Sequence, residues 1–246
     1  GQEDVILALA EVAKNLVVVN ISGSAVAMPW AGEVDAIVQG WYGGTESGNA
    51  LADVLTGKVN PSGRLPFTVP FRYEDGPIKT EAQYPGIKEE GDEYWQTHYS
   101  EGVYVGYRWY DTKDIPVQFP CGHGLSYTTF EYSNAKAAKS SMTASGTLKV
   151  SVDVENTGDY DGAEIVQLYI ADPEASIDRP AKELKGFEKV FLKAGEKKTV
   201  TFEIDAEDLS WFNAEKHEWT AEPGEFKALF ARSAGDVQAE ASFELK

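Results

Sequence analysis

The stretch Thr147-Leu-Lys-Val-Ser-Val-Asp-Val-Glu155 decides the fold of the C-terminal half of the chain. Apolar and polar residues alternate along it, because every second position holds an apolar side chain: Leu148, Val150, Val152 and Val154. Successive side chains of a β-strand point to opposite faces of a sheet. The period of two therefore predicts a strand with one face in a core and the other in solvent.

Further short strands follow this stretch and are separated by turn sequences. The expected strands are Ala163–Ala171, Phe187–Leu192, Lys198–Ile204, Glu225–Arg232 and Val237–Leu245, with turns at Asn156–Gly158, Lys193–Glu196 and Glu222–Glu225. Six or seven short strands, with a turn roughly every ten residues, are typical of an immunoglobulin-like or fibronectin-like sandwich. The chain has a single cysteine, so the disulfide framework of antibody domains is excluded and the fibronectin-like version is favoured.

The first part of the chain alternates helix and strand patterns instead. Apolar residues at helical spacing predict helices in Glu3–Lys14 and Asn49–Thr56, and Gly57 is the expected stop of the second helix. Leu16–Ile21 and Ala36–Trp41 are apolar runs, as strands buried on both faces are. Such repeats imply a parallel sheet covered by helices, and two or three strands form only part of one.

A long segment rich in Pro, Tyr, Trp and Gly separates these two patterns and has little periodicity. Structureless segments of this length are uncommon inside compact domains. The segment is therefore expected to wrap over a neighbouring surface, with its aromatic side chains against that surface.

The chain is strongly acidic, with a formal net charge of −18 that is shared evenly by the two sides of Gln118. An acidic surface repels phosphate backbones and anionic lipid headgroups, so neither nucleic acid nor a membrane surface is an expected partner. No apolar run approaches the roughly 20 residues that a membrane span needs. The first residues also lack the basic and then apolar pattern of a signal peptide.

Two loop motifs fit structural roles better than ligand binding. The Gly43–Gly48 loop lacks the glycine spacing and the Gly-Lys-Ser/Thr sequence of phosphate-binding loops, so a tight strand-to-helix turn is favoured. Arg64 lies in the stretch Asn60–Pro66, which contains two prolines and a glycine. Arg64 either binds an anionic ligand or pins its loop through a buried ion pair, and the ion pair is favoured.

The histidines and the cysteine give no sign of a metal or nucleophilic centre. His98, His123 and His217 have no metal-ligand spacing among them, so no metal or cofactor is expected. Cys121 and His123 are near neighbours, and side chains at such positions of an extended chain do not converge. A structural turn is therefore favoured over a Cys–His dyad.

Carboxylates are too numerous for pairing alone to identify a site. The acidic run Glu89–Glu93 is expected to be solvated. Glu101 follows Tyr99 in an aromatic-rich stretch, and aromatic faces near a carboxylate suit sugar rings, which present both C–H and hydroxyl groups. The same residues also suit packing at a domain junction, which the local pattern favours.

A series of motifs has an order and spacing that extends over the whole chain. The motifs are Gly1–Asp4, Val17–Gly23, Met28–Trp30, Trp41–Ala50, Ala52–Leu55, Gly57–Pro66, Tyr99–Asp111, Pro120–Thr128, Asn156–Gly158, Glu164–Tyr169 and Glu183–Phe187. Together they resemble the C-terminal part of glycoside hydrolase family 3, above all the β-glucosidase and β-xylosidase members that end in a fibronectin-like domain. Cys121 departs from the family, which usually has Phe there, and this departure is expected to change packing only.

The resemblance implies a fold in two unlike parts joined by a linker. The first is an α/β partial sandwich, with a mostly parallel sheet and flanking helices, and an all-β fibronectin type III-like sandwich follows it. Residues 1–70 are expected to form the C-terminal half of the α/β sandwich domain, residues 71–128 an aromatic, Pro-rich wrapping linker, and residues 129–246 the fibronectin type III-like domain. The main expected partner is the remainder of the same enzyme, which contains a TIM-like barrel, while homo-oligomerisation stays open.

The resemblance also implies an activity. Family members hydrolyse with retention through two carboxylates, a nucleophilic Asp on the barrel and an acid/base Glu on a loop of the α/β sandwich. Both motifs lie outside this sequence, so no catalytic residue is expected in it and the chain alone is expected to be inactive. The expected substrates carry terminal non-reducing β-D-glucosyl residues, with β-xylosides open as well.

The same resemblance directs attention to the aromatic loop Tyr94–Tyr110, which is expected to pack between domains. Its tip, with Trp95, Tyr99 and Glu101, is expected at the rim of the substrate cleft. A periplasmic or secreted location is favoured because many bacterial relatives have one, and a cytoplasmic location stays open. The competing hypothesis is a non-catalytic carbohydrate-binding or structural module, since fibronectin-like sandwiches are common in proteins that are not enzymes.

Overall fold

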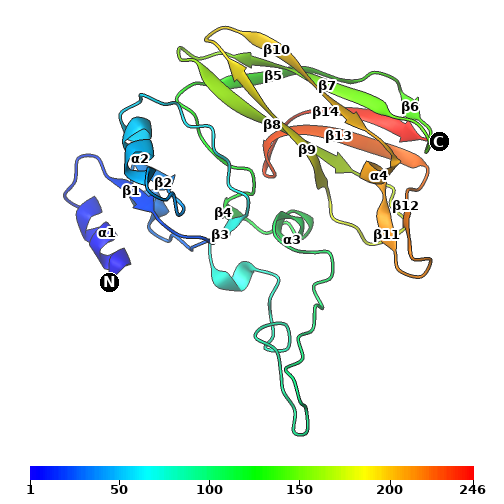
Figure 1. Cartoon of the computed structure of the whole chain (residues 1–246), viewed down its shortest axis with the longest axis horizontal. Coiled ribbons are helices and arrows are strands. Elements are labelled where there is room, and N and C mark those ends of the chain that lie inside the picture. The colour runs from blue at the N-terminus through cyan, green and yellow to red at the C-terminus, as the bar shows by residue number, and fades with distance from the viewer.

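The computed structural model describes residues 1–246, and its main feature is a β-sandwich of two sheets (Figure 1). The sheets have the strand orders β10-β7-β5 and β6-β14-β13-β8-β9. The strands are β5 (Phe130–Ala137), β6 (Ser141–Met142), β7 (Leu148–Asn156), β8 (Gly162–Ala171), β9 (Glu183–Leu192), β10 (Lys197–Ile204), β13 (Gly224–Ser233) and β14 (Asp236–Leu245). Neighbours pair antiparallel, except that β6 runs parallel to β14.

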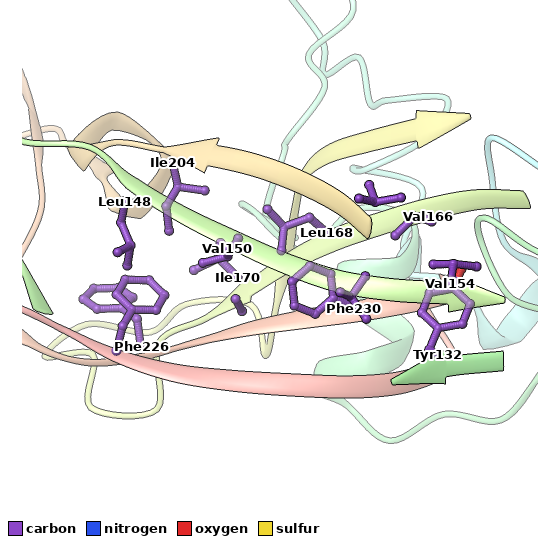
Figure 2. Close-up of a cluster of buried hydrophobic side chains, with 14 of the residues drawn as sticks. Tyr132, Leu148, Val150, Val154, Val166, Leu168, Ile170, Ile204, Phe226 and Phe230 are labelled. Carbon is purple, nitrogen blue, oxygen red and sulfur yellow. The ribbon is translucent and has the colours of Figure 1, made fainter. Parts of the chain in front are cut away.

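The alternation in β7 produces the core of this sandwich, as predicted. Its four alternating apolar side chains are at most 2% exposed and belong to a cluster of 19 buried residues. Residues from the opposite sheet complete the cluster, among them Val166, Leu168 and Phe230 (Figure 2). Full burial of one such side chain contributes about 1.5–3 kcal/mol. The sandwich therefore has a hydrophobic core of its own.

Short elements that the sequence pattern did not predict connect β10 to β13. They are α4 (Ala206–Leu209) and the antiparallel pair β11 (Trp211–Asn213) and β12 (Glu218–Thr220). Asp205 caps α4, since its Oδ1 accepts hydrogen bonds from the amides of Glu207 and Asp208.

The N-terminal part holds two helices and a two-stranded parallel sheet. Its elements are α1 (Gln2–Ala10), β1 (Val17–Asn20), η1 (Ala31–Glu33), β2 (Ala36–Gln39) and α2 (Ser47–Leu55). β1 and β2 pair in parallel, with Val18 opposite Ile37. Gly57 follows α2 with a φ of 74°, so the predicted helix stop is confirmed.

The expectation that these two strands are buried on both faces is wrong for this structure. No residue of β1 or β2 is fully buried, and Val17 is 44% exposed. The reason is that each strand has only the other as a neighbour. A small cluster of Met28, Trp30 and Val69 is the only buried apolar core in this part of the molecule.

The connecting segment packs against its neighbours at both ends and projects in the middle. It contains β3 (Val69–Pro70), η2 (Tyr73–Asp75), α3 (Tyr107–Thr112) and β4 (Val117–Phe119), and β3 pairs with β4. Residues 77–106, which we term the projecting loop, extend away from both the sandwich and the α1–α2 region (Figure 1). No helix of the structure has the length and apolarity needed to cross a membrane.

Candidate functional site

The projecting loop displays the aromatic side chains that the sequence suggested for a cleft rim. Trp95 is 64% exposed and Tyr99 is 80% exposed. Ile87 and Gln96 exchange two backbone hydrogen bonds of 2.9 and 2.8 Å, which close the loop tip into a narrow hairpin beside Trp95. Exposed aromatic rings on a braced hairpin offer apolar faces on which a ring-shaped ligand can stack.

Glu101 differs from the two aromatic residues in making a hydrogen bond within the loop. Its Oε2 accepts a hydrogen bond of 3.0 Å from the Nε2 of Gln83, which is buried. The Oε1 of Gln83 accepts from the amides of Lys79 and Thr80 at 2.8 and 3.2 Å. Gln83 therefore joins the two arms of the loop, and no hydrogen bond connects Glu101 to Trp95 or Tyr99.

The loop tip also carries acidic side chains. Glu89, Glu90 and Glu93 are exposed, as predicted for this run, and the Oε1 of Glu93 accepts a hydrogen bond of 2.7 Å from the Tyr94 hydroxyl. This bond is the main reason that the pKa of Tyr94 is raised. An aromatic face can stack on a sugar ring, and a neighbouring carboxylate can accept hydrogen bonds from the hydroxyl groups of that sugar. The side chains of the loop tip are therefore suited to the recognition of a sugar.

The glycine-rich loop Gly43–Gly48 leads directly into α2. The Oε2 of Glu46 accepts a hydrogen bond of 2.6 Å from the Asn49 side chain at the start of α2, so the predicted strand-to-helix turn is confirmed. No group of three or more His, Cys, Asp or Glu side chains gathers in a way that could hold a metal ion.

Cys121 and His123 contact different neighbours, which confirms the predicted structural turn. Cys121 packs against the buried cluster around Tyr169 and Leu229, and burial raises the pKa of its thiol. The His123 ring stacks on Phe119 with the ring centroids 5.3 Å apart, and burial lowers the pKa of His123. No hydrogen bond joins the thiol to the imidazole.

Arg64 connects the N-terminal part to the sandwich, and its predicted buried ion pair is confirmed. One guanidinium nitrogen lies 2.8 Å from the Oε1 of Glu164 on β8, and both side chains are less than 10% exposed. The neighbouring Asn60 adds to this contact, because its Oδ1 accepts from the Ser126 hydroxyl and the Tyr127 amide and its Nδ2 donates to the Asp161 carbonyl.

Two backbone segments cross next to this ion pair. Leu65 exchanges hydrogen bonds with the segment after Pro120, donating to the His123 carbonyl at 2.9 Å and accepting from the Gly122 amide at 2.7 Å. A Cβ atom at Gly122, whose φ is 82°, would lie 2.1 Å from the Gln167 side chain, and one at Gly124 would lie 2.2 Å from the Gly63 carbonyl oxygen. Both positions therefore require glycine. We term Asn60–Leu65, Gly122–Gly124, Glu164 and Gln167 the Arg64 junction.

A second junction joins α3 to residues 172–182, the connection between β8 and β9, which we term the arch. The Asp111 carboxylate lies 2.7 Å from the Lys182 ammonium group, and the Thr112 hydroxyl accepts a hydrogen bond of 2.9 Å from the Ala181 amide. Burial raises the pKa of Asp111 despite the opposite effect of Lys182. The Tyr107 hydroxyl accepts a hydrogen bond of 2.7 Å from the Leu184 amide just beyond the arch.

The end of the projecting loop is also held by the arch. The hydroxyl of buried Tyr104 donates a hydrogen bond to the Oδ1 of Asp178, and this bond raises the pKa of Tyr104 to about 12. The arch itself is braced by Arg179, which pairs with Asp172 at 3.0 Å and Glu183 at 2.9 Å. These contacts could not be predicted from sequence patterns, since polar residues in irregular segments carry no periodicity.

Comparisons with known proteins agree along the whole chain. Residues 1–107 match the Glycosyl hydrolase family 3 C-terminal domain, and residues 164–234 match the Fibronectin type III-like domain. Beta-glucosidase BoGH3A of Bacteroides ovatus is 49% identical over 248 residues, which cover 99% of this chain and 32% of the relative. Thermostable beta-glucosidase B of Acetivibrio thermocellus is 47% identical over 237 residues, which cover 96% of this chain and 30% of the relative.

Solved structures give the same result. A GH3 beta-glucosidase of Bifidobacterium adolescentis superposes with a TM-score of 0.90 at 42% identity, covering 99% of this chain and 35% of that structure. DesR, a beta-glucosidase from Streptomyces venezuelae solved in complex with D-glucose, superposes with a TM-score of 0.91 at 36% identity, covering 100% and 30%. The chain thus spans about a third of the length of the relatives that it matches.

Proposed function

The chain belongs to glycoside hydrolase family 3, in which it corresponds to the C-terminal portion, and we propose that it is the C-terminal part of a retaining β-glucosidase. The complete enzyme removes terminal non-reducing β-D-glucosyl residues, and its nucleophilic Asp and acid/base Glu lie outside these 246 residues. The observation that carries the proposal is the 49% identity to a named β-glucosidase across 99% of the chain.

The exposed apolar faces of the N-terminal part support this proposal. We assign residues 1–70 to one half of an α/β sandwich, residues 71–128 to a linker and residues 129–246 to a fibronectin type III-like domain. Parallel sheets are normally covered on both faces. The parallel pair β1 and β2, left half-exposed here, is therefore suited to joining further strands of the same enzyme.

Activity in the presence and absence of the barrel tests the proposal. The chain should be assayed alone and as part of the longer protein that contains the barrel, with p-nitrophenyl-β-glucoside as substrate. Turnover is expected only when the barrel is present. A folded, monomeric chain that binds cellobiose without hydrolysing it, and that has no barrel-containing partner, would instead establish a carbohydrate-binding module.

We place the tip of the projecting loop at the aglycone side of the cleft, with Trp95 and Tyr99 stacking on the leaving sugar and Glu101 bracing the loop. The exposed rings and the internal hydrogen bonds of Gln83 support this placement. Aromatic contacts of this kind contribute roughly 0.5–1.5 kcal/mol each. Their loss should therefore weaken substrate binding while leaving the chemical step intact.

The double variant Trp95→Ala/Tyr99→Ala of the complete enzyme tests this placement. The KM for cellobiose should rise about tenfold and kcat should change little, because two aromatic contacts of that strength are lost. Tyr160→Ala is the matched control, since Tyr160 is also largely exposed but lies on the sandwich between β7 and β8. An unchanged KM in the double variant contradicts the placement.

A further inference from the structure

The projecting loop has no hydrophobic core of its own that could fix its direction. Between its start at residue 77 and Tyr104, the only fully buried side chain is that of Gln83. Gln83 braces the two arms against each other, as described above, but its partners all belong to the loop itself. The direction in which the tip points is therefore determined where the loop meets the rest of the molecule.

The residues at the beginning of the projecting loop contact α3. Asp75, at the end of η2, pairs with Arg72 at 2.8 Å, and its carbonyl accepts a hydrogen bond of 2.9 Å from the Nε1 of Trp109. The ammonium group of Lys79 lies 5.6 Å from the centre of the Trp109 ring. Both groups that hold the beginning of the loop thus end on one side chain of α3.

The end of the projecting loop and α3 itself both contact the arch of the sandwich. Tyr104 bonds to Asp178, Asp111 pairs with Lys182, and the Thr112 hydroxyl accepts from the amide of Ala181. These contacts come from residues at least 69 positions apart in the sequence. In Figure 1 the loop has no other neighbouring element along its projecting part.

We propose that the arch of the fibronectin-like domain is the positioning element of the aglycone rim, with Tyr104 and Asp178 as the positioning pair. The arch holds α3, and α3 and the arch together hold the two ends of the projecting loop. The sandwich therefore determines where Trp95 and Tyr99 lie over the cleft. This inference rests on the proposed placement of the loop tip. It gives the fibronectin-like domain a part in substrate selection in addition to stability.

Tyr104→Phe and Asp178→Ala of the complete enzyme remove the two ends of the positioning contact. Each should raise the KM for cellobiose about three- to fivefold with kcat nearly unchanged. Inhibition by glucose, which needs only the glycone subsite, should keep its constant. Tyr160→Phe is the control for Tyr104→Phe, because it removes an exposed tyrosine hydroxyl that makes no hydrogen bond to the loop or the arch.

Combination with the rim variant separates positioning from a general loss of structure. In a Trp95→Ala/Tyr99→Ala background, Asp178→Ala should add less than twofold to the KM for cellobiose, because the side chains that it positions are gone. Hydrogen exchange of the amides of residues 99–107 should speed up in Asp178→Ala while that of β7 stays unchanged.

The outcomes distinguish the two proposals. If Trp95→Ala/Tyr99→Ala has no effect on the KM for cellobiose, the rim placement is wrong and the positioning proposal falls with it. If the rim variant raises the KM but Tyr104→Phe and Asp178→Ala do not, the rim is right and the positioning proposal is overturned. A full additive effect of Asp178→Ala in the rim background also overturns it.

Discussion

The sandwich and the α1–α2 region use similar side chains but bury them very differently. Val152 in β7 is 0% exposed, whereas Val17 in β1 is 44% exposed. The sandwich gathers 19 residues in one buried cluster, while the N-terminal cluster has three and neither α1 nor α2 has a buried residue.

The number of neighbouring elements explains this difference. β7 lies between β5 and β10 and faces a second sheet, so its apolar side is closed from all directions. β1 has one neighbouring strand and no opposite sheet. Because burial of apolar area is the main favourable term in folding, the sandwich is expected to hold its structure by itself, while the α1–α2 region depends on surfaces beyond those it contains.

Breaking the Arg64 junction should have the largest effect, because it joins the two regions through buried charges. Arg64→Met leaves the Glu164 carboxylate buried without its partner, which costs about 3–5 kcal/mol of unfolding free energy. Urea unfolding followed by circular dichroism measures this loss.

Two variants control this experiment. Lys58→Met breaks the exposed pair with Asp53 and should cost less than about 1 kcal/mol. The double variant Arg64→Met/Glu164→Leu should recover most of the loss, since no unpaired charge remains buried. A double variant as unstable as Arg64→Met contradicts this explanation.

A matched pair of leucine variants tests the contrast in packing. Leu168→Ala in β8 removes a side chain that is 1% exposed and should cost about 2–5 kcal/mol. Leu9→Ala in α1 removes one that is 45% exposed and should cost less than about 1 kcal/mol in the same chain. Equal losses in thermal or urea unfolding contradict the view that only the sandwich is closely packed.

The smallest effect concerns the titration of Tyr104, where the projecting loop meets the arch of the sandwich. Its pKa is raised to about 12 by the hydrogen bond to Asp178, so the folded state retains the phenolic proton more strongly than the unfolded state. The contribution of this group to stability is therefore fully present below about pH 10 and lost as the pH rises from 10 towards 12.

Carbon-13 NMR of labelled tyrosine rings measures this titration directly. Asp178→Ala should move one tyrosine resonance back to a midpoint near pH 10, and Tyr104→Phe should remove the same resonance. If Asp178→Ala leaves every tyrosine midpoint in place, the bond between the loop and the arch does not form in solution.

Part of the sandwich could be predicted from its apolar patterns, since β7 alternates without interruption, and β7 and β8 begin and end within one residue of the expected bounds. The strand Phe130–Ala137 was missed for a physical reason. A register shift between Ser133 and Lys136, with Asn134 at a φ of 54°, interrupts its period of two. The six-residue helix α3 was missed because a single turn or two gives no amphipathic pattern.

The candidate site was predictable only in part. The family resemblance, together with the aromatic composition of the loop, pointed to Trp95 and Tyr99, and the structure leaves both rings exposed. The bracing of Glu101 by Gln83 could not be foreseen, because a hydrogen bond between two irregular arms depends on a turn geometry that composition does not encode. The bond of Tyr104 to Asp178 spans 74 residues and is visible only once the sandwich has folded.

The crossing at Gly122 and Gly124 restricts how family members can be recombined. A chimaera that exchanges the fibronectin-like domain after residue 128 would keep both glycines from one parent and take the partners of Arg64 and Gly122 from the other. The Arg64 junction of this chimaera would therefore form only if the incoming domain supplies an acidic residue at the position of Glu164 and a glutamine at that of Gln167. At this junction, donor domains can thus be screened by two side chains before any chimaeric gene is made.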